Sequence, residues 1–361
     1  MQVQTAGRRK VMAIFFALIA AVFYALNAPL SKSLLEHVGP TMMAAFLYLG
    51  AGVGVGLLSL ADRKRSSQLE RLGRSDLPYV IGMVLLDIAA PIFLMFGLAS
   101  STAASTSLLN NFEIVATTVI ALCLFHETIT GRLWAGIALI TLASILLSVE
   151  DFSEGLSFSK GSLLVLLATI CWGFENNCTR KISGKSAFQI VFIKGIFSGL
   201  GSLVVALLIG ERLPVLRYLL GAMLLGFVAY GLSIFFYIRA QSTLGAAKTS
   251  AYYAVAPFIG ALLSFVFLHE QLSAHFALAL LVMLAGSVVV VVDTLIVHHQ
   301  HEHTHIVTHT HDGSTHEHTI VHTHEHTHLG TGAVHHHSHA TLASLEHGHW
   351  TIDEVHRLEK K

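Results

Sequence analysis

Apolar residues form ten long runs between residues 11 and 296, and short polar stretches separate them. Each run has about 20 residues, the length of helix that crosses a hydrocarbon core of about 30 Å. They are therefore predicted to be transmembrane helices at residues 11–35, 41–60, 78–99, 103–124, 131–149, 161–179, 187–209, 215–238, 249–268 and 274–296. After residue 296 the pattern changes to alternating His, Thr and Glu with few apolar residues.

The composition agrees with a membrane protein. Hydrophobic residues make up 53% of the chain and charged residues 12%, about half the charge of an average soluble domain. The formal net charge is zero, so bulk charge gives no reason to expect a nucleic-acid partner, and none is expected. The first apolar run is too long for a cleavable signal peptide and is expected to stay in the lipid bilayer.

Most basic residues lie on one side of the predicted membrane spans. With the spans above, 17 of the 22 Lys and Arg fall on one side, four fall on the other, and Lys194 lies within a span. The positive-inside rule then predicts a multi-pass protein of the plasma (inner) membrane with both termini in the cytoplasm. The acidic loop 150–160 is expected outside.

The chain contains an internal repeat. Residues 124–127 (LFHE) recur as residues 267–270 (FLHE), 143 positions later, and residues 24–27 correspond to residues 172–175 at an offset of 148. Five spans per half is an odd number, so the second half must be inverted relative to the first, an arrangement that builds a central site able to open to either side. The predicted parts are a cytoplasmic N-terminus (1–10), a first repeat (11–149), an external linker (150–160), a second repeat (161–296) and a His-rich cytoplasmic tail (297–361).

Short features of the two halves carry a family resemblance. Small residues (103–107 and 246–250) precede the fourth span of each half, that span contains Glu113-Ile114 or Ala256-Pro257, and a turn with His and Glu follows it (126–128 and 269–271). With these features and its duplicated ten spans, the chain resembles the EamA-type ten-helix members of the drug/metabolite transporter superfamily over residues 10–296. It departs from their pattern because acid and Pro are split between the halves and His stands where Gly is usual. The resemblance implies an all-α integral membrane fold of two inverted five-helix repeats that moves a small-molecule substrate, and it leaves the cargo open.

Polar side chains within the spans are the candidate site. A charge near the bilayer centre costs at least about 3 kcal/mol on insertion scales and persists only with a partner or a function. The residues predicted to line a substrate or ion pathway are Tyr24, Asn27, Asp87, Asn110, Glu113, Glu175, Asn176 and Lys194. Three acids against one base leave an excess of negative charge, which favours either a proton-linked mechanism, in which Asp87, Glu113 or Glu175 titrates, or a cationic cargo.

Structural alternatives exist for several of these residues. Glu175 and Lys194 could form a buried ion pair that only fixes packing, and Asn110 could be one of the hydrogen-bond links between helices. The tyrosines at 252–253 are interpreted as packing or interfacial aromatics, and the glycines in segment 50–56 as a close-packing seam. Prolines within three spans are expected to interrupt them and to free backbone carbonyls.

The tail from residue 298 holds 20 of the 24 His and is predicted to be mostly disordered. Imidazole binds zinc, nickel, copper and cobalt, so the tail is predicted to bind divalent transition-metal ions, although no cofactor is required. The predicted ligands are His301, His303, His305, His322, His324, His326, His335, His336 and His337. A passive low-complexity run or a pH sensor is the alternative.

The favoured function is a secondary transporter that exports a small organic solute, with a metal-binding tail. One alternative is a divalent-metal carrier in which Asp87, Glu113 and Glu175 coordinate the ion, although no His lies deep within a span. Another is a membrane metal sensor that transduces a signal without transport. The sequence has neither a glycine-rich phosphate loop nor a nucleophile elbow, so an enzyme is not expected.

Overall fold

Long helices account for all ten predicted spans. The computed structural model describes residues 2–61, 72–125, 129–151, 157–182, 185–244, 246–311 and 314–329. The contacts divide the chain into Met1–Asp293, called the bundle below, and Thr294–Lys361. The helical elements of the first half are α1 (Gln2–Ala25), α2 (Asn27–Leu34), α3 (Pro40–Ala61), the 3₁₀ turn η1 (Arg74–Asp76), α5 (Leu77–Ala99), α6 (Ala103–Leu109), α7 (Phe112–Phe125) and α8 (Gly131–Ser148).

The second half follows a short β-hairpin formed by β1 (Val149–Asp151) and β2 (Ser157–Phe158). Its helical elements are α9 (Lys160–Ile182), α10 (Ala187–Ile193), the π-helix η2 (Lys194–Ser198), α11 (Gly199–Leu208), α12 (Leu216–Gly226), the π-helix η3 (Phe227–Leu232), α13 (Ser233–Leu244), α14 (Ala246–Tyr253), α15 (Ala256–Leu268) and α16 (Ala274–Leu295). Two boundaries differ clearly from the prediction. The first helix begins at Gln2 and not at residue 11, and the eighth span continues to Leu244 and not to residue 238.

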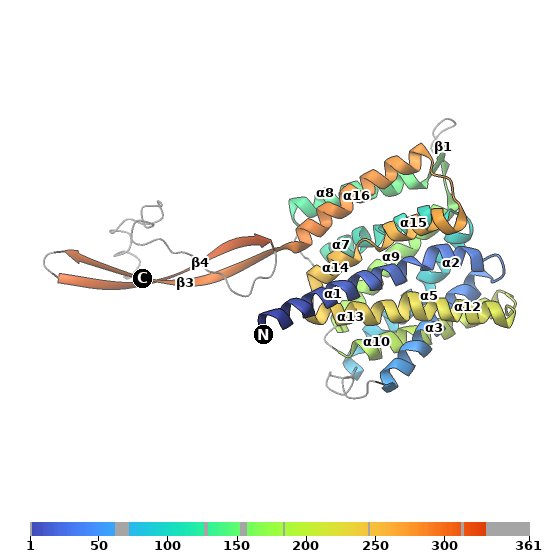
Figure 1. Cartoon of the computed structure of the whole chain (residues 1–361), viewed down its shortest axis with the longest axis horizontal. Coiled ribbons are helices and arrows are strands. Elements are labelled where there is room, and N and C mark those ends of the chain that lie inside the picture. Colours follow the sequence, from blue (N-terminus) through green and yellow to red (C-terminus); the bar gives the residue numbers. More distant parts are fainter. Residues whose placement is uncertain are drawn as a thin grey trace. The chain divides into compact units, whose positions relative to one another are not determined.

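Within the described residues, nine helical stretches are long and apolar enough to cross a membrane. The remaining predicted span is α9, which has 23 residues but carries Glu175, Asn176 and Asn177 in its second half. Figure 1 shows the bundle helices side by side between two ends. The α2 end carries α2, β1 and the loop before α12, and at the α1 end α1 begins and α16 finishes. The chain is thus an all-α membrane bundle whose most polar span is α9.

Several spans are broken near their middle. The first breaks at Leu26, the fourth at Asn110–Asn111 and the ninth at Ala254–Val255, while the seventh and eighth each contain a π-helical segment. The breaks in the fourth and ninth spans lie within one residue of matching positions of the repeat. Pro91 does not interrupt its span, contrary to the prediction, since α5 continues through it. Such irregular segments suit the lining of a cavity, because backbone N–H and C=O groups that lack a partner within the helix can form hydrogen bonds with other groups.

Glycines allow α3 to pack closely against the second half. A Cβ built on Gly50 would lie 2.0 Å from the Met223 carbonyl oxygen, and one on Gly195 would lie 2.4 Å from the Gly52 Cα. Only residues without a Cβ fit at such backbone approaches. The glycine seam predicted from segment 50–56 is therefore confirmed.

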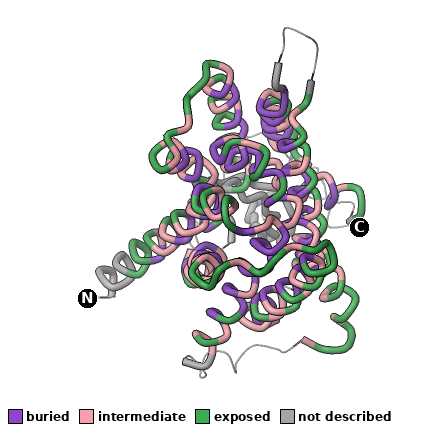
Figure 2. The backbone as a smooth tube through the Cα atoms, turned by 90° about the vertical axis from the view of Figure 1, so that its right-hand side faces the viewer, coloured by how far each residue is buried: buried purple, intermediate pink, exposed green. Residues whose placement is uncertain are grey.

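The core runs through the centre of the bundle. Met42, Met43 and Leu47 from α3 pack with Leu94 and Met95 from α5, all of them fully buried. Buried positions lie toward the interior of the bundle in Figure 2, and many exposed ones lie on its outer surface. Exposed leucines and valines such as Leu220 and Leu281 are expected there, because the outer surface of a membrane bundle faces lipid.

The first part of the tail is a β-hairpin. β3 (Ile296–His311) pairs antiparallel with β4 (Ser314–Leu329), with Ile296 opposite Leu329 and His311 opposite Ser314. The structure thus describes strands in a stretch for which the sequence predicted mostly disorder. The sequence there alternates His with Thr, Val, Ile and Glu, and the β-branched residues in this period-two pattern favour strands. Residues 330–361, which include His335, His336 and His337, lie outside the described residues.

Candidate functional site

A cavity of about 560 Å³ lies within the bundle and draws its walls from both halves of the chain. Its irregular walls come from the breaks, because Asn110, Ala254, Lys194 and Tyr230 lie in or beside broken or π-helical segments. The polar and aromatic lining residues are Tyr24, Tyr48, Asn110, Asn111, Glu113, Trp172, Glu175, Asn176, Thr179, Lys194, Tyr230, Tyr237, Gln241 and Tyr253.

Lys194 holds two carboxylates beside the cavity. Its Nζ lies 2.9 Å from Glu175 Oε1 and 3.2 Å from Asp87 Oδ2. Asp87 is fully buried and Glu175 is 2% exposed. Asp87 also accepts a hydrogen bond of 3.0 Å from the Tyr48 hydroxyl, and Thr179 donates one to Glu175. The predicted Glu175–Lys194 pair is therefore part of a three-member cluster with a formal charge of −1 when all its members are ionised.

Glu113 lies apart from this cluster and is held by an amide. Asn176 Nδ2 donates to Glu113 Oε1 at 2.7 Å and to Thr117 Oγ1 at 3.2 Å. The contact requires α9 to lie close to α7, and Gly173 permits it, because a Cβ there would lie 2.8 Å from the Ala116 Cβ. Glu113 thus has a neutral partner, and among the described residues it forms no ion pair within 4.0 Å.

Five tyrosines form a continuous belt around the cavity. The ring of Tyr48 contacts Tyr230, with 5.5 Å between centroids, and Tyr230 contacts Tyr24 at 5.9 Å. Tyr24 contacts Tyr253 at 5.8 Å, and Tyr253 contacts Tyr237 at 5.2 Å. The belt is defined by these five residues and links α3, η3, α1, α14 and α13.

Protein groups hold the belt in place through the hydroxyls. Asn27 donates to the Tyr230 hydroxyl at 3.0 Å, the Tyr253 hydroxyl lies 3.2 Å from Ser233 Oγ, and the Tyr237 hydroxyl lies 2.7 Å from Ser250 Oγ. The Tyr48 hydroxyl is bonded to Asp87. With their hydroxyls engaged, these four residues offer a ligand mainly the surface of their rings.

The residues predicted for the pathway occupy two positions. Tyr24, Asn110, Glu113, Glu175, Asn176 and Lys194 line the cavity. Asn27 and Asp87 lie behind the wall, where Asn27 supports Tyr230 and Asp87 pairs with Lys194. Asn110 is 9% exposed, and its amide oxygen has no hydrogen-bond partner within the described part of the chain.

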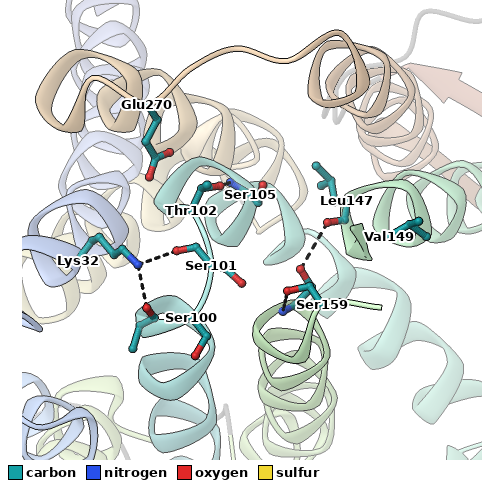
Figure 3. Close-up of a pocket in the computed structure, with 11 residues that line it drawn as sticks. Lys32, Ser100, Ser101, Thr102, Ser105, Leu147, Val149, Ser159 and Glu270 are labelled. Carbon is teal, nitrogen blue, oxygen red and sulfur yellow. Dashed lines mark hydrogen bonds between the residues drawn. The ribbon is translucent and has the colours of Figure 1, made fainter. Parts of the chain in front are cut away.

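A second pocket, of about 460 Å³, lies at the α2 end, and five of its eleven lining residues are serines (Figure 3). Lys32 Nζ donates there to the carbonyl oxygens of Leu98, Ala99 and Ser101 at 2.7, 3.0 and 2.8 Å. These carbonyls are at the C-terminal end of α5, where a cation is favoured by the helix dipole. Lys32 thus ties the first span to the third at this end.

Two carboxylates of the second half bind helix starts of the first half. Glu270 accepts hydrogen bonds from the backbone N–H groups of Ala103 and Ala104 at 2.7 and 2.9 Å. Glu211 accepts from Thr41 and Met42 in the same way, at 3.0 and 2.7 Å. These contacts, called the latch below, join the two halves at the α2 end, because unpaired N–H groups at a helix start favour a carboxylate.

The turn that carries Glu270 begins with a strained residue. His269 ends α15 with φ of 52°, in the left-handed region that glycine adopts without cost. The sequence had shown His at a position where Gly is usual, and the structure supplies the backbone reason for that preference. The corresponding turn of the first half, residues 126–128, lies outside the described residues.

Sequence reasoning missed much of the aromatic lining. Tyr253 was interpreted as packing, and Tyr48, Tyr230 and Tyr237 were not predicted to form a site. The repeat gave one usable signal, since Trp172, which lines the cavity, occupies the position that corresponds to Tyr24. The other tyrosines come together only through the packing of five separate elements.

Among the described side chains, no group of three or more His, Cys, Asp and Glu is placed to hold a metal ion. Lys194 lies between Asp87 and Glu175, where a metal shared by these carboxylates would need to be.

Comparison with known proteins gives consistent matches. The family described as "EamA-like transporter family" matches residues 11–149 and 159–292. An uncharacterized transporter from Methanothermobacter thermautotrophicus is 27% identical over 299 residues, which cover 77% of this chain and 85% of that protein. A crystal structure of another protein aligns with a TM-score of 0.57 at 18% identity, over 77% of this chain and 94% of that one, which is a likeness of fold.

Proposed function

The chain belongs to the EamA-like transporter family, and from this premise we propose that it exports a small organic solute by alternating access. The observation that carries the proposal is the cavity of about 560 Å³ between the two halves. Its size is within the range of about 300–1,000 Å³ that small-molecule sites occupy.

The two ends of the bundle differ in a way that suits alternating access. At the α2 end, the latch and Lys32 join helix ends. The cavity lining extends toward the α1 end through Thr179 and Gln241, which are partly exposed and lie close to Arg180 and Arg239 in the sequence. These features support a state that is closed at the α2 end and accessible toward the α1 end.

Membrane orientation supports export. The positive-inside rule places the α1 end in the cytoplasm, since most Lys and Arg residues outside the spans gather on that side. A cavity accessible from there can load a cytoplasmic solute, and opening the latch would release the solute outside. The proposed location is the plasma (inner) membrane.

Uncompensated charge supports coupling to protons or a cationic solute. Asp87, Glu113 and Glu175 carry three negative charges when ionised, and Lys194 supplies the one positive charge that contacts them within the described bundle. A low-dielectric interior tolerates such an excess only if a proton or a cation joins. Of the three, Glu113 is best placed to exchange its partner, because an amide alone holds it.

Efflux from proteoliposomes tests transport. Vesicles that contain the purified full chain are loaded with a mixture of amines, amino acids and organic acids, and released solutes are identified by mass spectrometry with and without a pH gradient. Release of at least one solute faster than from protein-free vesicles supports the proposal. Release no faster than from these vesicles, for every solute and gradient, refutes it.

The same vesicles test the other two functions. A metal carrier would take up Zn²⁺, Ni²⁺ or Co²⁺, and that uptake would be lost in Glu113→Gln or Glu175→Gln. The Lys194 ammonium between two of the three proposed ligands weighs against it. A metal sensor would move neither metal nor organic solute.

For the tail, a divalent-metal site is proposed on the β3–β4 hairpin. The strand register places His301 opposite His324 and His303 opposite His322. His299 lies opposite His326, whereas His305 lies opposite Ile320. Opposite residues of an antiparallel pair are neighbours and alternate residues share a face, so the register puts these three His pairs at adjacent positions of the hairpin.

Zinc binding tests the tail site. Equilibrium dialysis compares the full chain with a variant in which His301, His303, His322 and His324 are all replaced by Asn. Loss of most of the bound Zn²⁺ supports the site, and unchanged binding refutes it. A matched variant with His305, His311, His318 and His328 replaced by Asn should retain more Zn²⁺, because none of these four has a His opposite it.

A further inference from the structure

We propose that the central cavity selects an organic cation, a protonated amine with an apolar body, over zwitterions and anions. The inference rests on the proposed transport function and assigns its substrate class. It draws on the acceptors, the aromatic belt and the charges of the cavity.

Acceptors without a cationic partner lie together on the fourth span. Glu113 is held by the neutral amide of Asn176, and the buried amide oxygen of Asn110 has no hydrogen-bond partner in the described residues. Asn110 and Glu113 are three residues apart, and both line the cavity. An ammonium donates hydrogen bonds and accepts none, so such a pair of acceptors suits it.

The aromatic belt suits a cation as well. Tyr48, Tyr230, Tyr24, Tyr253 and Tyr237 all line the cavity, and four of their hydroxyls are bonded to protein groups. Ring faces carry negative partial charge and attract ammonium groups within about 6 Å of the ring centroid. Because protein contacts fix the rings, little side-chain entropy is lost when the ligand binds.

The cation already present argues against a carboxylate ligand. Within the described lining, Lys194 is the one positively charged side chain, and its ammonium is shared by Asp87 and Glu175. The carboxylate of an anion or zwitterion would have to displace one of these buried carboxylates, and the displaced group would lose its partner. A cation requires no such exchange and reduces the negative excess of the site.

Three ligands with one aromatic body test the charge preference. Phenethylamine, phenylalanine and 3-phenylpropionate are cationic, zwitterionic and anionic at neutral pH. Calorimetric titration of the detergent-purified full chain should show phenethylamine binding at least about tenfold more tightly than the other two. Equal or tighter binding of phenylalanine or 3-phenylpropionate overturns the inference, as does the absence of saturable phenethylamine binding.

Variants locate the site. Glu113→Gln should weaken phenethylamine binding about tenfold. Tyr253→Leu should weaken it about fivefold, whereas Tyr253→Phe keeps the ring and stays within about twofold of the unmodified chain. Glu36→Gln, at an exposed position of the α2 end, is the matched control and should leave binding unchanged. Unchanged binding in both Glu113→Gln and Tyr253→Leu overturns the inference.

These outcomes are separable from a failure of the proposed function. Binding in detergent does not depend on flux, and the ligand comparison uses the unmodified chain, so it does not depend on the folding of any variant. Preference for a zwitterion or an anion overturns the cation assignment and leaves transport intact. Tight phenethylamine binding without flux of any solute would instead overturn the transport proposal.

Discussion

Replacing Glu270 by Gln should open the α2 end of the bundle. The carboxylate accepts two backbone hydrogen bonds, of 2.7 and 2.9 Å, at the start of α6. A carboxamide has one oxygen and no charge, so one bond and the favourable interaction with the helix start are lost. Together these are worth about 1–2 kcal/mol. If the contact exists only in the state closed at this end, the ratio of open to closed molecules rises about fivefold to thirtyfold.

A cysteine behind the latch reports this shift. Ser107 is 3% exposed and lies one turn beyond Ala103 and Ala104, so Ser107→Cys is shielded in the closed state. In a background without the three native Cys, a membrane-impermeant maleimide added outside should label Ser107→Cys more rapidly when Glu270→Gln is present. Glu36→Gln is the control for loss of an exposed carboxylate at the same end. Labelling that is unchanged or slower in the Glu270 variant would refute the latch as a barrier.

Three further predictions concern the charge cluster, the glycine seam and the tail. Lys194→Met should destabilise the bundle by about 3–5 kcal/mol, because two buried carboxylates lose their ammonium partner. Lys194→Arg should retain most of the stability. Thermal unfolding in detergent measures both variants, and equal melting temperatures would show that the charge cluster does not stabilise the bundle. Gly50→Ala should lower the free energy of unfolding by about 1–3 kcal/mol, because the added methyl would meet a carbonyl oxygen at 2.0 Å. A methyl at Gly131 meets nothing within 4 Å, so Gly131→Ala should not destabilise the bundle. A larger loss of stability in Gly131→Ala than in Gly50→Ala would be inconsistent with the seam. Ending the chain after Val297 should abolish most Zn²⁺ binding in equilibrium dialysis and leave organic-solute efflux unchanged. If the shortened chain retains its bound Zn²⁺, the metal site is not in the tail.

The ten spans and most of their boundaries could be predicted from the sequence because lipid imposes a strong local rule. A transmembrane helix must form hydrogen bonds with its own backbone groups and present about 20 apolar residues to lipid. Whether a segment meets this requirement depends on its own residues alone. The positions of Glu113, Glu175 and Lys194 within spans could be predicted for the same reason, since an intramembrane charge is conspicuous in an apolar run. In the tail, the same period-two alternation of residues fits both a low-complexity segment and the strands β3 and β4.

The sequence by itself determined the membrane bundle, its internal repeat and a set of polar residues that lipid alone would not tolerate. Only the tertiary structure decided how these residues are partnered: Lys194 lies between Asp87 and Glu175, whereas Glu113 is held by an amide. It also decided that tyrosines from five elements form one belt and that Glu270 binds a helix start of the other half. Burial in lipid depends on each helix separately, but ion pairs, ring contacts and the latch depend on distances between helices, which the packing of the two halves sets.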